Sequence, residues 1–138
     1  MMKLGELVRR SEPLRKINSK LVRLVGYKTG VDRNEIPTVV CKTWTPLEYI
    51  IGNKIRRSAD QNKYTSSIKF LDRKYNIKCS CSCPDFMYRW EWANNQVGAA
   101  DIIFGNGDPP DIQNPGHVPG MCKHLLRLRT EIKRRHGV

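Results

Sequence analysis

The sequence of 138 residues contains no long apolar run and no apolar stretch near its start. A bilayer-spanning helix needs about 20 mostly apolar residues, and a secretory signal needs an apolar segment behind a basic start. The first ten residues, MMKLGELVRR, supply neither. We therefore expect no membrane span and an intracellular, cytoplasmic location. In that reducing setting, closely spaced cysteines favour metal ligation over disulfides.

Recognisable catalytic motifs are also missing. The sequence shows no Ser/His/Asp set, no phosphate-binding glycine loop and no HExxH. We expect a protein that is not an enzyme and has no small-molecule substrate. Internal repeats and low-complexity tracts are absent too, and 39% hydrophobic with 28% charged residues is typical of a globular chain.

Acidic residues are scarce, since 13 Asp and Glu stand against 25 Lys and Arg, for a net charge of +12. This balance suits phosphate-bearing nucleic acid, although a basic surface that only confers solubility is the plain alternative. The charge is unevenly distributed, because residues 84–121 sum to −4 while residues 1–30, 31–78 and 122–138 sum to +6, +5 and +5. A basic body with an acidic insert indicates two surfaces with different partners.

Residues 1–63 predict a basic N-terminal extension. Apolar residues over 14–24 recur at helical spacing, and β-branched residues over 38–44 are typical of a strand. The predicted elements are a helix from the cap at Ser11 to Gly26, a loop over 26–37, a strand over 38–44 and a short helix from Thr45 to Gly52.

Residues 64–138 predict a hairpin, an insert and a closing helix. By the two-residue strand period, Ile77, Cys79 and Cys81 should share one face of the second strand. The predicted elements are strands over 64–70 and 75–81, a helix over 84–96, a loop over 98–120 and a helix over 121–135 with Leu125, Leu128 and Ile132 on one stripe.

Two distant fragments, CSCSCPDF at 79–86 and PGMCKHLLRL at 119–128, together offer metal ligands. Zinc prefers four sulfur or imidazole ligands in a tetrahedron. Two residues separated by one can converge on a metal where the backbone turns, as before Pro84 and at the start of the last helix. The pairs predict a closed Cys3His site that binds the hairpin to the final helix and stabilises a small core.

These fragments resemble the SWIM-type zinc finger, whose pattern is Cys-x-Cys, a variable gap and Cys-x-His. Pro-Asp-Phe follows the second cysteine at 84–86, and Cys-Lys-His-Leu stands at 122–125. The resemblance covers roughly residues 64–135. It implies one structural zinc ion held by Cys81, Cys83, Cys122 and His124, and a module that binds DNA or other proteins. The segment 105–125 also looks like those of short phage-encoded SWIM-type proteins.

The chain departs from that family in one respect, and two further residues are alternative metal ligands. The 38 residues between Cys83 and Cys122 exceed the usual gap. Cys79 is the alternative to either hairpin cysteine, and His117 is the alternative to His124. The expected fold is α+β, with a SWIM-like module over 64–138, its insert at 84–121 and the extension over 1–63.

We expect this module to act by binding. Lys and Arg residues of the hairpin and the last helix are candidates for one phosphate-contacting face, namely Lys69, Arg73, Lys74, Lys78, Arg127, Arg129, Lys133, Arg134 and Arg135. Trp90 and Trp92 are candidates for base stacking, with a core or interface role as the favoured interpretation. The alternative function is a phage structural or assembly protein, located in the virion, whose insert and N-terminal helix dock onto other subunits.

Overall fold

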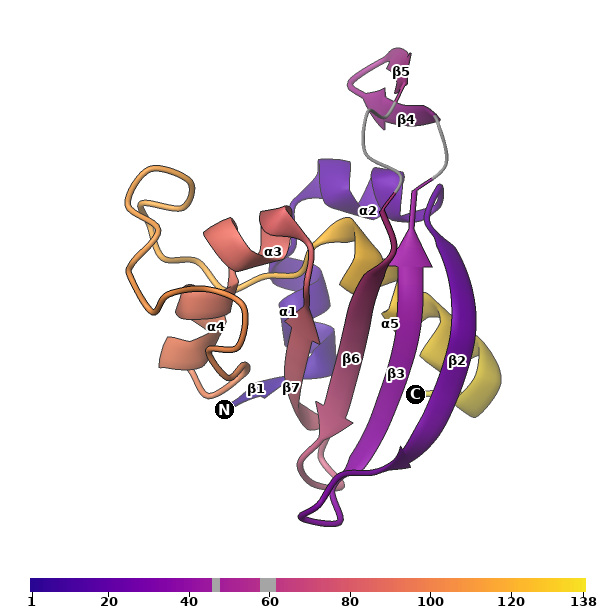
Figure 1. Cartoon of the computed structure of the whole chain (residues 1–138), viewed down its shortest axis with the longest axis vertical. Coiled ribbons are helices and arrows are strands. Elements are labelled where there is room, and N and C mark those ends of the chain that lie inside the picture. Colours follow the sequence, from indigo (N-terminus) through magenta and orange to yellow (C-terminus); the bar gives the residue numbers. More distant parts are fainter. Residues whose placement is uncertain (46–47, 58–61) are drawn as a thin grey trace.

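The computed structural model describes residues 1–45, 48–57 and 62–138 and has an α+β fold (Figure 1). The elements in chain order are β1 (Met2–Lys3), α1 (Leu4–Arg10), α2 (Pro13–Ser19), β2 (Arg23–Val31), β3 (Pro37–Trp44), β4 (Glu48–Ile51), β5 (Lys54–Arg57), β6 (Tyr64–Phe70), β7 (Asn76–Cys81), α3 (Pro84–Arg89), α4 (Glu91–Gln96) and α5 (Lys123–His136). Antiparallel pairing gives a five-stranded sheet in the order β1-β7-β6-β3-β2, and β4 and β5 form a separate two-stranded sheet.

The two-residue period of the strands gives the sheet one buried and one open face. In β7, Ile77, Cys79 and Cys81 are all buried, as predicted for the hairpin. In β6, Ser66 and Ile68 are buried, and they lie opposite Cys81 and Cys79 respectively. The cysteines therefore enter the core from the inner face of the sheet.

Helix α5 covers this inner face. Its predicted stripe is confirmed, since Leu125, Leu128 and Ile132 are at most 1% exposed. Leu7 of α1 and Phe86 of α3 belong to the same core cluster. Figure 1 shows α1 and α5 behind the sheet. Fully burying each such side chain contributes about 1.5–3 kcal/mol, so apolar packing is a large part of what holds α5 to the strands.

The first long helix is shorter than predicted, and the predicted loop over 26–37 is confirmed only for residues 32–36, between strands β2 and β3. Helix α2 ends at Ser19, and Arg23–Val31 form strand β2 paired with β3. Gly26, with a positive φ of 70°, lies in the irregularity of this pairing between Val25 and Lys28. The helical spacing over 14–24 does not extend the helix, because pairing with β3 gives the backbone N–H and C=O groups of residues 23–31 hydrogen-bond partners in a strand.

The short helix predicted from Thr45 to Gly52 is also wrong. Glu48–Ile51 form β4, which pairs with β5 so that Ile51 lies opposite Lys54. Gly52 adopts a φ of 59° between these strands, as tight two-residue hairpin turns require. Residues 46 and 47 of this prediction lie outside the described residues.

The predicted helix over 84–96 is interrupted at Trp90, where α3 ends and α4 begins. The predicted irregular segment over 98–120 has no helix or strand in the structure. The sheet joins both predicted segments of the chain, because β3 pairs with β6 and Met2 of β1 lies opposite Ile77. One core cluster accordingly includes residues from both sides of residue 63.

Candidate metal centre

Four ligand-type side chains meet where the hairpin, α3 and α5 come together. Cys81 ends β7, Cys83 precedes α3, Cys122 precedes α5, and His124 lies in the first turn of α5. Their ligand atoms all lie within 4.8 Å of one another, and all four residues are buried. Ligands of a tetrahedral zinc with bonds of about 2.3 Å are about 3.7 Å apart, so the cluster has the size of a metal site.

The hairpin cysteines converge by strand geometry. Ser82 still donates its backbone N–H to the carbonyl of Thr65 at 3.1 Å, so the chain stays paired beyond Cys81. Cys81 and Cys83 then share the inner side of β7 by its two-residue period. The sharp turn that the sequence placed between them comes later, because Cys83 is extended and Pro84 opens α3.

Hydrogen bonds from neighbouring groups point at two of the sulfurs. The hydroxyl of Ser66 donates to Cys81 Sγ at 3.3 Å, and the backbone N–H of Phe86 donates to Cys83 Sγ at 3.4 Å. The Ser66 hydroxyl also lies 2.8 Å from Thr43 Oγ1. Donors around a sulfur stabilise the thiolate form that binds metals and fix its direction.

The three thiols of the cluster also shift one another's pKa values. Burial acts to raise the pKa of Cys81, but hydrogen bonds with Cys122, Cys83 and His124 outweigh it and leave that pKa lowered. The pKa of Cys122 is raised, first by burial and then by the neighbouring thiols. The pKa of Cys83 is also raised, because its hydrogen bond with Cys122, which acts to lower it, is outweighed by Cys81 and burial. A bound cation would lower the pKa of every thiol in the cluster, because it stabilises the thiolate form.

His124 supplies the test of whether a metal fits. Its Nδ1 is buried and has no hydrogen-bond partner in the described part of the chain. A buried ring nitrogen without a hydrogen-bond partner costs free energy. In metal sites one imidazole nitrogen binds the metal and the other makes a hydrogen bond, so both nitrogens have partners. Three thiols with one imidazole are a donor set compatible with zinc. We conclude that Cys81, Cys83, Cys122 and His124 form a candidate metal-binding cluster.

The two alternative ligands lie elsewhere. Cys79 is the buried residue of β7 two positions before Cys81, and Asn94 Nδ2 lies 3.5 Å from its sulfur. Burial raises its pKa to about 12, so it stays a neutral thiol. His117 stands in the insert with its ring against Trp92 at 4.6 Å, and its Nε2 lies 3.4 Å from Asp111. Neither residue belongs to the cluster.

The predicted phosphate-contacting residues are divided between two faces of the sheet. Lys69 and Lys78 lie opposite each other in register and alternate with the buried residues of β6 and β7, so they occupy the open face. Each pairs with a carboxylate, Lys69 with Asp32 at 2.9 Å and Lys78 with Asp101 at 2.8 Å. Helix α5 packs on the other face. Hairpin strands and helix therefore do not form one surface.

The arginines of α5 gather around a buried carboxylate. Glu131, whose side chain is 7% exposed, accepts hydrogen bonds from Arg127 at 3.2 Å, from Arg135 at 2.8 Å and from Arg134. These bonds, those of Arg134 first, lower the pKa of Glu131 to about 2. Arg129 is half-buried on the same helix.

A groove of about 300 Å³ runs between β2 and α5 beside this carboxylate. We call it the arginine groove, and it is lined by Arg23, Leu24, Val25, Gly26, Tyr27, Arg127, Glu131 and Arg135. The guanidinium of Arg135 lies over the Tyr27 ring at 4.1 Å. The sequence interpretation missed Arg23 and Tyr27 because it placed them in a helix and a loop.

Trp90 and Trp92, the two tryptophans considered for base stacking, have structural partners. Trp90 is 4% exposed and belongs to the core, with the Arg15 guanidinium 5.2 Å from its ring centre. Trp92 is half-buried against His117. The favoured interpretation of these residues as core aromatics is supported for Trp90 by its burial.

No protein-family model, no curated protein and no solved structure significantly matches this chain. Its function must therefore be argued from the site. Within the described residues, no helix combines the length and apolarity that crossing a bilayer requires.

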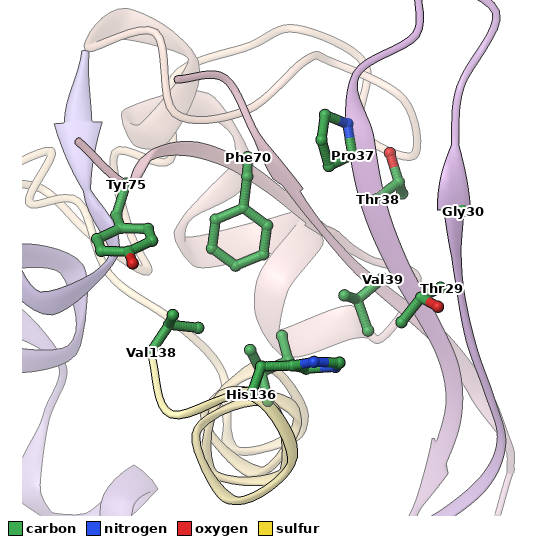
Figure 2. A pocket seen from close by; sticks show the side chains of 10 residues that line it. Thr29, Gly30, Pro37, Thr38, Val39, Phe70, Tyr75, His136 and Val138 are labelled. Carbon is green, nitrogen blue, oxygen red and sulfur yellow. The ribbon is translucent and has the colours of Figure 1, made fainter. Parts of the chain in front are cut away.

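A hollow of about 240 Å³ lies at the opposite end of α5 from the metal cluster (Figure 2). It is lined by Thr29, Gly30, Pro37, Thr38, Val39, Phe70, Tyr75, Ile132, His136 and Val138. The walls are mainly aliphatic and aromatic, and His136 is one of the lining residues. The imidazole Nε2 of His136 lies 3.1 Å from the Tyr27 hydroxyl.

Proposed function

We propose that this chain is a zinc-binding module that acts by binding nucleic acid through phosphate contacts. The observation that carries the proposal is the arginine groove, where Glu131 and Tyr27 hold arginine side chains in place on a chain of net charge +12. Cys-x-Cys followed by Cys-x-His, as in SWIM-type zinc fingers, supports the zinc assignment. In that family the module is thought to bind DNA or proteins.

Zinc acts as a structural link in this proposal. Cys81 and Cys83 belong to the hairpin and α3, whereas Cys122 and His124 begin α5. A cation held by all four would fix the start of α5 against β7. Four protein ligands leave no open coordination position for a reacting water, so the proposal includes no catalytic step.

Glu131 makes the arginine groove suitable for phosphate. Each guanidinium carries five N–H donors, and Arg127 and Arg135 each give one of them to Glu131. A held guanidinium loses less conformational entropy when it contacts a phosphate than a freely rotating one does. The three arginines bound to Glu131 keep a local net positive charge. Such contacts favour any phosphate backbone and read no base sequence.

The test is a salt titration of binding to a labelled 20-base-pair duplex, followed by fluorescence anisotropy. Zinc-loaded protein should lose affinity steeply as salt rises, because each neutralised phosphate releases counterions. Arg127→Gln with Arg135→Gln should weaken binding at least about tenfold and reduce the log–log salt slope by about 2. Lys28→Gln with Lys42→Gln, a matched charge change on β2 and β3, is the control and should leave the slope nearer the wild-type value.

Circular dichroism and zinc content of both double variants verify that each is folded. A shallow salt dependence of the wild type, or equal losses in the two double variants, would refute the phosphate-binding proposal. The assembly function predicts that shallow dependence together with a stoichiometric protein partner.

A further inference from the structure

The segment between Trp90 and Cys122 has the opposite charge character to the rest of the chain. None of the 25 Lys and Arg residues lies within 90–122, whereas four carboxylates do, namely Glu91, Asp101, Asp108 and Asp111. Figure 1 shows much of this segment looping away from the sheet beside α3 and α4. The phosphate-binding proposal gives it no role, since carboxylates repel phosphates.

Buried polar side chains of α4 hold the loop that follows this helix at two places, at Phe104–Gly105 and at Gly120. Glu91, 1% exposed, accepts the backbone N–H groups of Phe104 at 3.1 Å and Gly105 at 2.7 Å. Asn94, fully buried, exchanges two hydrogen bonds of 2.9 Å with the backbone of Gly120. The hydrogen bonds to the loop compensate the desolvation of this buried carboxylate and this buried amide. The insert is therefore built into a defined conformation.

The outer part of the insert is fixed in the same way. Asn114 donates to the carbonyl of Arg89 at 2.7 Å and to that of Val118 at 2.9 Å, and it accepts the Val118 N–H at 3.1 Å. Arg89 in turn donates to the carbonyl of Gln113 at 3.1 Å. These bonds connect the loop to the end of α3.

This ordered loop and the neighbouring helix α3 present apolar side chains to solvent. Ile112 is 90% exposed, Tyr88 60% and Ile103 57%. Beside them lies a groove of about 560 Å³, which we call the insert groove. Its lining residues are Met87, Tyr88, Phe104, Gly105, Asn106, Asp108, Pro109, Pro110, Asp111, Ile112 and Gln113. A groove of this size, with apolar walls and a few polar groups, is typical of a binding site.

We propose that the insert groove binds a segment of a protein partner that carries Lys or Arg beside an aliphatic or aromatic side chain. The apolar side chain would bury Ile112 and Tyr88, and the cation would pair with Asp108 or Asp111. Charge complementarity selects this partner, because the groove contains carboxylates and no basic residue. The preformed loop lowers the ordering cost of binding. The proposal is independent of the arginine groove, which lies between β2 and α5.

The experiment uses full-length, zinc-loaded protein and a displayed library of random 12-residue peptides. Enriched peptides should contain Lys or Arg next to Leu, Ile, Phe or Trp. The best synthetic peptide should bind Ile112→Ser at least about tenfold more weakly than wild type, as expected when one burial contact is lost. Asp108→Asn with Asp111→Asn should weaken binding and flatten its salt dependence.

The control is Val40→Ser, which removes an exposed aliphatic side chain from β3 on the open face of the sheet and should leave peptide affinity unchanged. Equal affinity of wild type and Ile112→Ser, enrichment of peptides without basic residues, or no enrichment would overturn the proposal. Displacement of the peptide by excess duplex DNA would overturn it too, as would self-association of the wild type that Ile112→Ser abolishes. Failure of DNA binding alone would leave it intact.

Discussion

Replacing Cys122 by serine tests the metal centre most directly. Serine is close to cysteine in size, so the change removes one sulfur of the candidate metal-binding cluster with little change in volume. Cys122 is fully buried at the start of α5, and its partners Cys81 and Cys83 lie at the end of the hairpin. Under the proposed function a zinc ion links the helix start to β7, and the variant would lack one of its four ligands. We expect Cys122→Ser to lose zinc and stability together.

The expected loss is large because structural zinc supplies about 10–16 kcal/mol in small finger peptides, while whole domains are stable by about 5–15 kcal/mol. Here Leu125, Leu128 and Ile132 still hold α5 to the sheet without metal, so we expect about a third of that range, roughly 4 kcal/mol, to be lost. At about 3 °C per kcal/mol for a domain of this size, the Tm should fall by at least about 12 °C.

Elemental analysis and thermal unfolding by circular dichroism measure both effects on the same samples. Wild type should contain about one equivalent of zinc. Chelator treatment of wild type should reproduce the Tm of the variant, because both remove the same link. If Cys122→Ser keeps stoichiometric zinc, or if its Tm and that of chelated wild type stay within about 2 °C of untreated wild type, the structural role of the cluster is refuted.

Three further predictions concern neighbouring groups. Cys79→Ser should keep the full zinc content, and loss of the metal would show that Cys79 is a ligand. Gly120→Ala should destabilise the fold by about 1–3 kcal/mol in urea unfolding, because its Cβ would lie 2.8 Å from Trp90 Nε1; an unchanged midpoint would contradict this close contact. The pKa of Glu131 is lowered from 4.5 to about 2, so its contribution to stability is present above pH 4.5 and is lost as pH falls toward 2. Glu131→Gln should remove the loss of stability between pH 4.5 and 2 that comes from this carboxylate. Identical acid-unfolding profiles of wild type and variant would argue against the hydrogen bonds between Glu131 and its arginines.

Local patterns predicted the hairpin and the last helix well. Alternation in 76–81 and the stripe of Leu125, Leu128 and Ile132 each report burial on one side of an element, and both are confirmed. The same approach was wrong over 23–25 and 48–51, which it assigned to helices, and over 26–31, which it assigned to a loop because of the bounding glycines. There the choice between helix and strand depends on a pairing partner elsewhere in the chain.

For the candidate site, too, the sequence predicted some features and the tertiary structure decided others. The sequence by itself determined the donor chemistry, because Cys81, Cys83, Cys122 and His124 occur as two short pairs in a chain with few cysteines. It also determined the acidic character of the insert.

The tertiary structure decided which groups meet. Cys79 is directed to Asn94 instead of the cluster, the hairpin lysines are separated from α5 by the sheet, and Glu131 gathers its arginines beside β2. The positions of Cys79 and of the hairpin lysines follow from strand register and helix packing, which join residues far apart in the sequence and leave no local pattern. The arginines around Glu131 stand three or four residues away on the same helix, and tertiary packing decides only that this cluster lies beside β2.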